Sequence, residues 1–461
     1  MTTNRTVCLV FSVILGTDAS GVALDWPQWR GPNRDGKVAG FTGPETWPEE
    51  LAQKWKVEVG NGVSTPALVG DRLYVFARQE NNEVTHCLDA NTGAEIWKDQ
   101  YAADPATGSA RDFPGPRSSP TVFGGKVITY GASGTLSCLD AETGKVVWRK
   151  SDYADSLPRF FTSSSPIVAA GLCIAQLGGE EGGAIVGYDL DSGDTVWQWA
   201  EDGTAYASPV LMSVNGTPII IAETDDKIVG LEPKTGKVVW QKPYAVVGRG
   251  YNAATPVVDG TTIYYTGSNR GAAAVKIAKQ GDTLTAEELW HNDDNSVQYN
   301  TPVLKDGLLY ALSDRDVLFC INAESGKTLW TDMVFAGNRG ADAGRARQAG
   351  GGRQARGDRQ ARDGQQPNAG GRQGGRRGGR GGGGGGRGGS RPGYGSIVDA
   401  GSVLFALTPA AQLIVFQPSD TGLQQIASYK VAEGETYAYP IVAGSRLFVK
   451  DADSVTLWTI E

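Results

Sequence analysis

The side chains best suited to binding chemistry are arginines, tyrosines and asparagines that stand in short segments before recurring Ser/Thr-Pro or similar dipeptides. They are Arg117, Arg159, Tyr206, Arg249, Tyr251, Asn252, Tyr299, Asn300, Tyr437 and Tyr439. Guanidinium groups form forked hydrogen bonds with carboxylates, and they stack on aromatic rings, as planar ligands also do. Gathered at one mouth, this set would suit a carboxylated, planar or glycan ligand, and it would equally suit a peptide partner. The alternative is ordinary loop polarity around a solvent channel.

The sequence offers little for catalysis or for metal binding. Asp293, Asp294 and Asn295 could supply oxygen ligands to Ca²⁺, although an ordinary acidic turn is the favoured interpretation. His86 and His291 are the only histidines, and we interpret both as solvated or structural. There is no Cys-x-x-Cys-His haem signature and no His-rich metal spacing. From the residues alone we therefore assign no catalytic side chain and no metal ligand.

The cysteines follow a positional pattern of their own. Cys87, Cys138 and Cys320 each stand just before a leucine or isoleucine at the end of an apolar run, and Cys173 lies elsewhere. Equivalent places on different sheets of an array point into different layers, whereas a disulfide needs Cα atoms within about 7 Å of each other. We interpret these cysteines as small buried apolar residues.

A repeated sequence cassette indicates the strands that must position these polar residues. An acidic or Asn position is followed by a Thr/Ser-Gly turn, three further residues and a tryptophan. The copies are LDANTGAEIW (88–97), LDAETGKVVW (139–148), YDLDSGDTVW (188–197), LEPKTGKVVW (231–240) and INAESGKTLW (321–330), with a looser copy ending at Trp290. Successive tryptophans are about 40–50 residues apart, which is the period of one four-stranded propeller blade.

Each part of the cassette has a physical role. The apolar run before the acid predicts a strand, and the glycine supplies the positive φ that a short hairpin loop with a bulge requires. The acidic or amide side chain can accept hydrogen bonds from free amides of the loop. Each buried tryptophan removes about 150–250 Å² from water. We therefore interpret the seven tryptophans as structural residues that dock one blade on the next: Trp55, Trp97, Trp148, Trp197, Trp240, Trp290 and Trp330.

A second repeated marker indicates how many blades the chain forms. A Ser/Thr-Pro or related dipeptide, followed by a short apolar run and a glycine turn, begins near residues 64, 118, 164, 207, 254, 300, 395 and 438. Proline is tolerated at the first residue of a strand, where its missing amide is not needed. The last copy has room for three strands only, and the segment 53–60 with Trp55 would supply the fourth. The sequence therefore predicts an all-β, eight-bladed propeller of four-stranded antiparallel blades, closed by its N-terminal strand.

The N-terminal residues carry separate signals. Residues 1–23 contain one arginine, an apolar run and small residues, as in a secretory signal peptide, and the run is too short to span a membrane. An uncleaved anchor or a cytoplasmic start is the alternative. Cys8 lacks a lipid-attachment context. Residues 24–52 would form a latch, with Trp26, Trp29 and Arg30 packed across one face of the ring.

An insertion interrupts the array at 337–393. It holds 13 Arg against 3 Asp, whereas the rest of the chain has 30 Lys and Arg against 48 Asp and Glu, a net charge of −18. With almost no apolar residues, such a segment is expected to be disordered. It could bind a polyanion, because Arg-Gly tracts bind single-stranded nucleic acid, although secretion would favour glycans, lipid headgroups or the acidic ring itself. A tolerated low-complexity insertion is the favoured interpretation.

The cassette resembles the tryptophan-docking repeat of the pyrroloquinoline-quinone (PQQ) propellers, a superfamily that includes quinoprotein dehydrogenases and BamB-like envelope proteins. The resemblance covers about 53–335 and 395–461, and the segment DWPQWRGPNRDG (25–36) resembles the start of secreted bacterial PQQ-repeat proteins. The dehydrogenases use a Ca²⁺-bound quinone, an aspartate base and usually a vicinal cysteine pair. This chain has no Cys-Cys dipeptide, and no Glu–Asn–Asp set can be matched to their metal site.

The resemblance therefore implies a scaffold without recognisable chemistry. We expect a secreted or periplasmic, non-catalytic binding protein of the cell envelope, monomeric and with no cofactor. Its partner would be an envelope protein or an anionic polymer, with nucleic acid disfavoured by secretion. The alternative is a PQQ-dependent dehydrogenase of alcohols or sugars, which would require PQQ and Ca²⁺.

Overall fold

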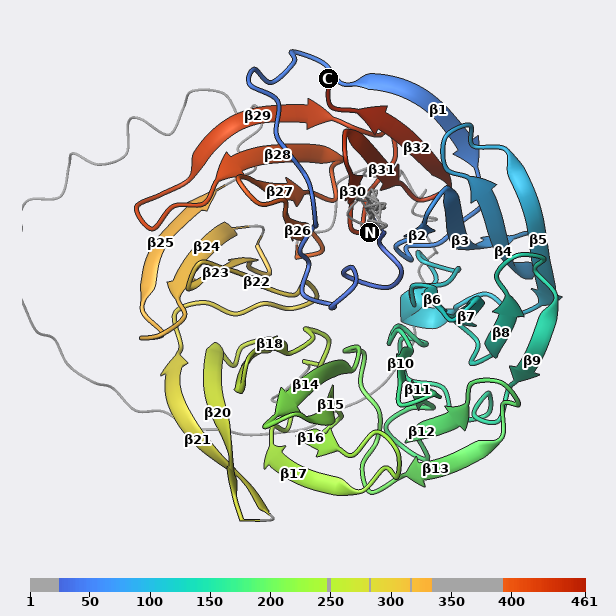
Figure 1. The fold of residues 1–461 in the computed structure, drawn as a ribbon, viewed down its shortest axis with the longest axis vertical. Coiled ribbons are helices and arrows are strands. Elements are labelled where there is room, and N and C mark those ends of the chain that lie inside the picture. Colours follow the sequence, from blue (N-terminus) through green and yellow to red (C-terminus); the bar gives the residue numbers. More distant parts are fainter. Residues whose placement is uncertain (1–24, 247–249, 282, 316, 334–392) are drawn as a thin grey trace, which may run out of the picture. The chain divides into compact units, whose positions relative to one another are not determined.

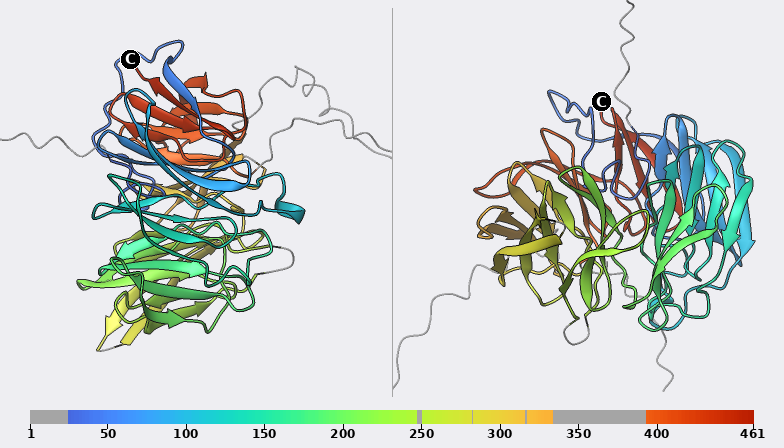
Figure 2. Two further views of the ribbon diagram at one scale, coloured as in Figure 1. Left: turned by 90° about the vertical axis from the view of Figure 1, so that its right-hand side faces the viewer. Right: turned by 60° about the horizontal axis from the view of Figure 1, so that its bottom comes forward.

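A computed structural model describes residues 25–246, 250–281, 283–315, 317–333 and 393–461. The predicted signal peptide (1–23), Arg249 and nearly all of the predicted insertion (337–393) lie outside the described residues. The described strands form eight four-stranded antiparallel sheets arranged around one axis (Figure 1). Each sheet begins with its strand nearest the axis and ends at the rim. Figure 2 shows the same sheets from the side. The predicted eight-bladed propeller is confirmed.

The first four blades follow the chain in order. Blade one comprises β2 (Ala67–Val69), β3 (Arg72–Gln79), β4 (Asn82–Asp89) and β5 (Glu95–Ala102), followed by a short 3₁₀ turn, η1 (Gly108–Ala110). Blade two comprises β6 (Thr121–Phe123), β7 (Lys126–Tyr130), β8 (Leu136–Asp140) and β9 (Val146–Lys150). Blade three comprises β10 (Ile167–Ala169), β11 (Leu172–Leu177), β12 (Ala184–Asp189) and β13 (Thr195–Trp199). Blade four comprises β14 (Val210–Val214), β15 (Thr217–Glu223), β16 (Lys227–Leu231) and β17 (Val238–Pro243).

The remaining blades complete the ring. Blade five comprises β18 (Val257–Asp259), β19 (Thr262–Thr266), β20 (Ala272–Gln280) and β21 (Thr283–Asn292). Blade six comprises β22 (Val303–Lys305), β23 (Leu308–Leu312), β24 (Val317–Asn322) and β25 (Thr328–Met333). Blade seven comprises β26 (Ser396–Asp399), β27 (Leu404–Leu407), β28 (Gln412–Gln417) and β29 (Gln424–Lys430). Blade eight comprises β30 (Ile441–Ala443), β31 (Arg446–Lys450), β32 (Ser454–Thr459) and, at its rim, β1 (Ala52–Glu58).

The two ends of the propeller share the last blade. Strand β1 pairs antiparallel with β32, from Ala52 opposite Thr459 to Glu58 opposite Ser454, and lies outside it in Figure 1. The indole of Trp55 then reaches blade one, where its Nε1 donates to the carbonyl of Ala90 at 3.2 Å. The predicted closure of the ring by the N-terminal strand is confirmed.

The docking tryptophans pack on the glycine turns of the next blade. The Nε1 of Trp97, Trp148 and Trp197 donates to the carbonyls of Ala141, Leu190 and Pro233 at 3.1, 3.1 and 2.9 Å. A Cβ added to the turn glycine would lie within 2.3 to 2.9 Å of the facing indole at each of five turns. These glycines are Gly93, Gly144, Gly193, Gly236 and Gly326, all with positive φ. Glycine is therefore required twice over, by the backbone conformation and by the close approach of the ring.

The structure also explains the acidic residue of the cassette and the cysteines by their local contacts. Asp89 accepts hydrogen bonds from the amides of Asn91 and Thr92, and the side-chain bond from Thr92 is the main reason that the pKa of Asp89 is lowered. Cys87 stands directly opposite Trp97 in the sheet, where blades two to six have cysteine, glycine or alanine opposite their docking tryptophan and blade eight has Leu457 opposite Trp55. Cys87, Cys138, Cys173 and Cys320 are free and buried, which confirms their interpretation as small core residues.

The Ser/Thr-Pro markers form a girdle of hydrogen bonds around the axis. The amide of Thr65 donates to the hydroxyl of Ser119, and the amide of Ser119 donates to that of Ser165, at 3.0 and 2.9 Å. The same link continues through Ser208, Thr255 and Thr301, and Tyr439 of blade eight donates to Thr65. In six of the eight markers a hydroxyl therefore fastens one blade to its neighbour, and the proline leads into the inner strand.

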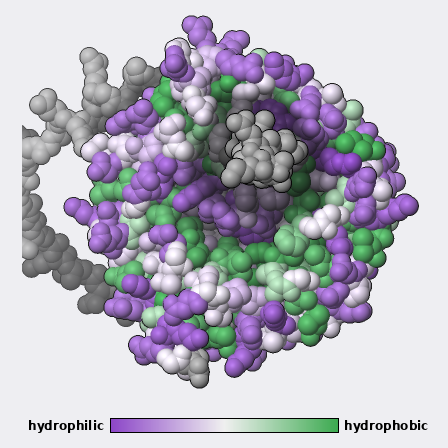
Figure 3. Space-filling view, viewed as in Figure 1, coloured by the Kyte–Doolittle hydropathy of each residue, from purple (hydrophilic) through white to green (hydrophobic). Residues whose placement is uncertain are grey.

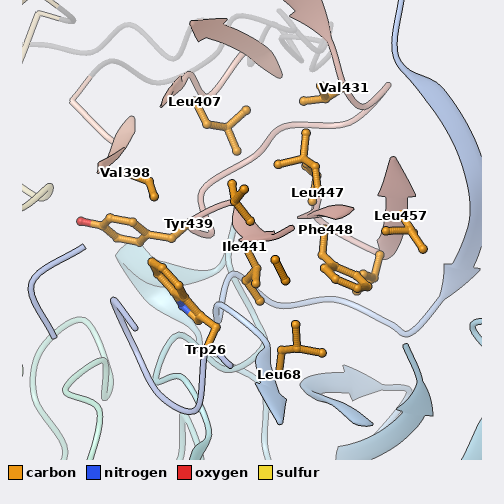
Figure 4. Packing of buried hydrophobic residues seen from close by; sticks show 14 of the residues in the cluster. Trp26, Leu68, Val398, Leu407, Val431, Tyr439, Ile441, Leu447, Phe448 and Leu457 are labelled. Atoms are coloured by element: carbon orange, nitrogen blue, oxygen red, sulfur yellow. The ribbon is translucent and has the colours of Figure 1, made fainter. Parts of the chain in front are cut away.

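The segment before β1 packs against the inner strands. Trp26 exchanges two backbone hydrogen bonds with Leu68 of β2, and Lys37 pairs with Asp399 of β26. Figure 4 shows Trp26 beside Tyr439 and Ile441 within the core of blades seven, eight and one. Figure 3, drawn from the side on which this segment lies, shows hydrophilic side chains around the rim.

Two buried arginines of this segment reach the axis. Arg34 donates to the carbonyls of Ser165, Pro166 and Pro209 in blades three and four, and Arg30 donates to the carbonyl of Pro302 in blade six at 2.7 Å. Burial lowers the pKa of Arg34 to about 9, which leaves it cationic at neutral pH. Arg30 and Arg34 thus tie blades three, four and six to one short loop. No helix among the described residues is both long and apolar enough to cross a membrane.

Candidate binding cavity

A cavity of about 370 Å³ opens at the axis, among the loops that lead from the rim of one blade into the inner strand of the next. We call these the lead-in loops. The residue two places before each Ser/Thr-Pro hydroxyl position faces this cavity in most blades. These residues are Val63, Arg117, Ser163, Tyr206, Ala253, Tyr299 and Tyr437. The repeat therefore delivers one side chain per blade to the same place, whereas the chemical type of that side chain varies.

Aromatic rings make a continuous wall around this cavity. Tyr299 lies between Tyr251 and Tyr394, with ring centroids 6.1 and 4.1 Å away and nearly parallel planes. Phe160 continues the wall beyond Tyr251 at 4.9 Å. On the other side Tyr394 contacts Tyr437 at 5.3 Å, and Phe113 and Tyr206 complete the wall. Aromatic rings at these separations stabilise one another and present a rigid apolar surface.

Arg117 is the charged side chain in the described lining. Its Nη2 donates to the carbonyl of Phe113 at 2.8 Å, which fixes the guanidinium against the wall. Its Nη1 is buried and has no hydrogen-bond partner among the described residues. Burial lowers the pKa of Arg117 to about 10, so the group stays cationic at neutral pH. Burial raises the pKa of Tyr206 to about 12, so that phenol stays uncharged.

Hydroxyl groups and a tryptophan form the floor. Thr65, Ser119, Ser208 and Thr255 belong to the girdle, and their oxygens accept amide hydrogen bonds while the side chains border the cavity. Trp29 also borders the cavity and meets Tyr439 edge to face at 5.9 Å. The N-terminal segment therefore closes the axis beneath the cavity, and the opening lies on the side of the lead-in loops.

Six of the predicted mouth residues line this cavity. They are Arg117, Tyr206, Tyr251, Tyr299, Tyr437 and Tyr439. Arg159 does not belong to the lining, is exposed, and lies over the ring of Phe160 at 5.2 Å. Arg249 lies outside the described residues.

The two predicted asparagines have supporting positions behind the wall. Asn300 is buried, and its amide donates to the carbonyl of Leu312 at 2.6 Å. Asn252 is also buried, and its amide donates to the carbonyls of Thr224, Asp225 and Tyr244. Arg270 donates to the side-chain oxygen of Asn252. A buried amide with several fixed partners positions a loop, and here it holds the loop that carries Tyr251.

Among the aromatic residues of the lining, sequence reasoning missed four: Trp29, which was expected only to pack on a face, and Phe113, Phe160 and Tyr394. Tyr394 follows the predicted insertion directly, where a glycine and a serine replace the Ser/Thr-Pro marker. Phe113 and Phe160 precede their markers by five or more residues. A signal was present, because counting two places back from every marker would have given seven of the lining residues directly.

The predicted calcium candidates are engaged in a turn. Asp293 is exposed and lies 2.9 Å from His291, while Asp294 and Asn295 both hydrogen-bond to the hydroxyl of Thr328. Within the described parts of the chain, no three His, Cys, Asp or Glu side chains are placed to hold a metal ion. His86 is buried between Glu95 and the carbonyl of Val59, which is a structural position.

Two groups of known proteins resemble this chain. The quinohemoprotein alcohol dehydrogenase of Comamonas testosteroni is 31% identical over 32% of this chain, a match that spans only 21% of that relative's length. Its crystal structure covers 95% of this chain and 80% of that chain, with a TM-score of 0.63 at 15% identity, which shows a shared fold. The described lining of the cavity contains no Asp, Glu, His or Cys side chain. The residues present therefore do not fit a metal-bound quinone with a carboxylate base.

The second group of relatives matches over more of its length. The outer membrane protein assembly factor BamB of Burkholderia pseudomallei is 25% identical over 63% of this chain and 84% of its own length. The crystal structure of BamB from Moraxella catarrhalis covers 89% of this chain and 99% of that chain, with a TM-score of 0.56 at 16% identity. The family model described as outer membrane protein assembly factor BamB matches residues 34–198 and 80–332. Because these matches span more than half of the sequence, the chain belongs to this BamB family of PQQ-repeat propellers.

Proposed function

We propose that this chain is a non-catalytic binding protein of the bacterial cell envelope, which holds a partner at the aromatic cavity. The observation that carries this proposal is the composition of the described lining: a rigid aromatic wall, one arginine and a floor of hydroxyls. Aromatic and arginine side chains in a partly desolvated pocket are the usual anchors of a bound partner. The longer matches to BamB proteins support a role in the envelope.

The catalytic alternative finds less support in the same lining. General acid–base chemistry needs a group that can take up and release a proton near neutral pH, in reach of the substrate. The titratable side chains of the described lining are Arg117 and tyrosines, and burial moves the pKa of Arg117 and Tyr206 to about 10 and 12. No observation on the cavity favours quinone-dependent oxidation over binding.

A crosslinking experiment tests the binding role. A photoreactive residue is placed at Ser163, on the cavity wall, and in a second variant at Glu142, an exposed cassette-loop position that lies outside the lining. We expect Ser163 to give a discrete crosslinked product in envelope extracts, and Ala253→Phe, which fills the cavity, to suppress it. Identical products from both positions, or no product from Ser163, would contradict the proposal.

A second measurement addresses catalysis. The purified protein is mixed with PQQ and Ca²⁺, and reduction of an electron-accepting dye is followed with alcohols and sugars. We expect no turnover above the protein-free control. Dye reduction that requires the protein, the quinone and the substrate together would replace the binding role with an oxidoreductase.

A further inference from the structure

The described lining of the cavity carries positive charge and no negative charge. Arg117 is its charged side chain among the described lining residues, and the carboxylates of the neighbouring loops lie outside the lining. Glu435 is exposed and accepts the hydroxyl of Tyr437 at 2.7 Å. Glu83 is buried behind the wall, where it accepts hydrogen bonds from Tyr101 and from the amide of Ala132. Both carboxylates have protein partners, whereas Nη1 of Arg117 has none among the described residues.

The floor adds neutral donors beneath that cation. The oxygens of Thr65, Ser119, Ser208 and Thr255 each accept an amide hydrogen bond from the adjoining blade. No acceptor for their hydroxyl protons is found among the described residues, so these protons can be offered to a molecule in the cavity. A buried donor without an acceptor destabilises the empty cavity, and a ligand that brings acceptor oxygens removes this cost.

The wall limits how a ligand can lie. Tyr251, Tyr299 and Tyr394 are too close together for a ring to enter between them, because a stacked ring needs about 3.5 Å on each side. A ligand ring must therefore rest along the exposed face of the wall. A volume of about 370 Å³ has room for one or two six-membered rings.

We infer that the cavity binds a carboxylate carried on a six-membered ring, with the ring against the tyrosine wall and the carboxylate at Arg117 and the floor hydroxyls. This inference rests on the proposed binding role and names its ligand class. The ring can be an acidic sugar, free or at the end of a polymer, or an aromatic acid. A ring without charge leaves Nη1 of Arg117 without a hydrogen-bond partner, and a carboxylate without a ring leaves the wall uncovered. Both halves of the ligand are therefore needed.

The test uses the full chain and five small probes. Sodium glucuronate and sodium benzoate combine ring and charge, glucose and benzyl alcohol have the ring alone, and acetate has the charge alone. Binding is followed by fluorine NMR of protein labelled with 3-fluorotyrosine, with signals assigned through Tyr251→Phe and Tyr299→Phe. We expect saturable shifts of these cavity tyrosines with glucuronate or benzoate, and at least tenfold weaker binding of the other three probes.

Two arginine variants separate a specific contact from general charge. Arg117→Gln should weaken binding of the ring carboxylate by about tenfold or more, since a charge-assisted hydrogen bond is lost. Arg159→Gln removes the same charge from an exposed residue outside the lining and should leave binding within about twofold. If Arg117→Gln fails to fold, Ala253→Phe fills the cavity without altering Arg117 and should abolish the shifts.

The outcomes distinguish the ligand class from the binding role. Equal binding of the neutral probes or of acetate, or binding that Arg117→Gln leaves unchanged, would overturn the inference. So would a cavity that takes only peptides or only PQQ. If the Ser163 crosslink persists while no ring carboxylate binds, the ligand class is wrong and the envelope-binding role stands. Binding of glucuronate alone or of benzoate alone supports the inference and identifies the source of the ring.

Discussion

The docking tryptophans at the rim and the lining of the cavity both arise from the same repeat. They differ in how much the residue type varies from blade to blade. At the rim, five of the seven docking tryptophans face a glycine of the same turn, because the ring approaches closer than any Cβ allows. At the lining, the equivalent position is occupied by valine, arginine, serine, alanine or tyrosine. Positions that carry the fold are therefore uniform around the ring, and positions that can carry recognition differ from blade to blade.

The largest effect on stability is expected when one carbon is added to a turn glycine that faces a docking tryptophan. In Gly236→Ala the new Cβ would lie 2.3 Å from the indole of Trp197, at a φ of +68°. We expect a loss of about 3 kcal/mol in the free energy of unfolding, since overpacking and a left-handed backbone combine. Urea denaturation measures this loss.

Gly216→Ala is the matched control for the backbone alone. Gly216 also has a positive φ, +79°, but nothing lies within 4 Å of an added Cβ. It should cost about 1 kcal/mol. Equal losses at Gly216 and Gly236 would mean that the contact between indole and glycine does not hold the blades together.

The same contrast explains what could be predicted from sequence. Contacts that recur, such as Trp148 on Gly193, leave a periodic signal, so the number of blades and their closure by the N-terminal strand were predicted correctly. Lining residues leave a signal only in their spacing from each marker. Tyr206 and Tyr299 were found because tyrosine is conspicuous, and Tyr394 was missed beside an altered marker. Asn252 and Asn300 look identical in type to binding residues, and only three-dimensional contacts place them behind the wall.

An intermediate effect is expected at the acidic group between blades three and four. Burial raises the pKa of Asp225 to about 6, with further contributions from Glu180, Asp226 and Asp202. A carboxyl whose folded pKa exceeds its unfolded value of 3.8 favours folding below that value and loses this contribution as the pH rises through about 6. Asp225→Asn should therefore stabilise the protein by about 1 kcal/mol at pH 7.5, allowing for partial exposure, and should give no gain at pH 4.

The control for this prediction is a carboxylate far from the group. The side chain of Asp293 is 91% exposed, and Asp293→Asn removes an equal charge. It should change the free energy of unfolding by less than about 0.5 kcal/mol at either pH. Urea denaturation at pH 4 and 7.5 measures both variants. A gain for Asp225→Asn that is the same at the two pH values would show that ionisation of Asp225 is not its cause.

The smallest effect on stability is expected when one heavy atom is added to a residue of the cavity lining. Gly236→Ala also adds one heavy atom, but at a turn on which a docking tryptophan packs. Ala253 borders the cavity, and blade three already has serine at the equivalent position, Ser163. Ala253→Ser should change the free energy of unfolding by less than about 0.5 kcal/mol, because the hydroxyl enters open space and can be hydrated. Fluorine NMR of the cavity tyrosines should nevertheless record a local change. A loss comparable to that of Gly236→Ala would mean that the lining is as tightly packed as the docks, and the cavity could then not serve as a site free to vary.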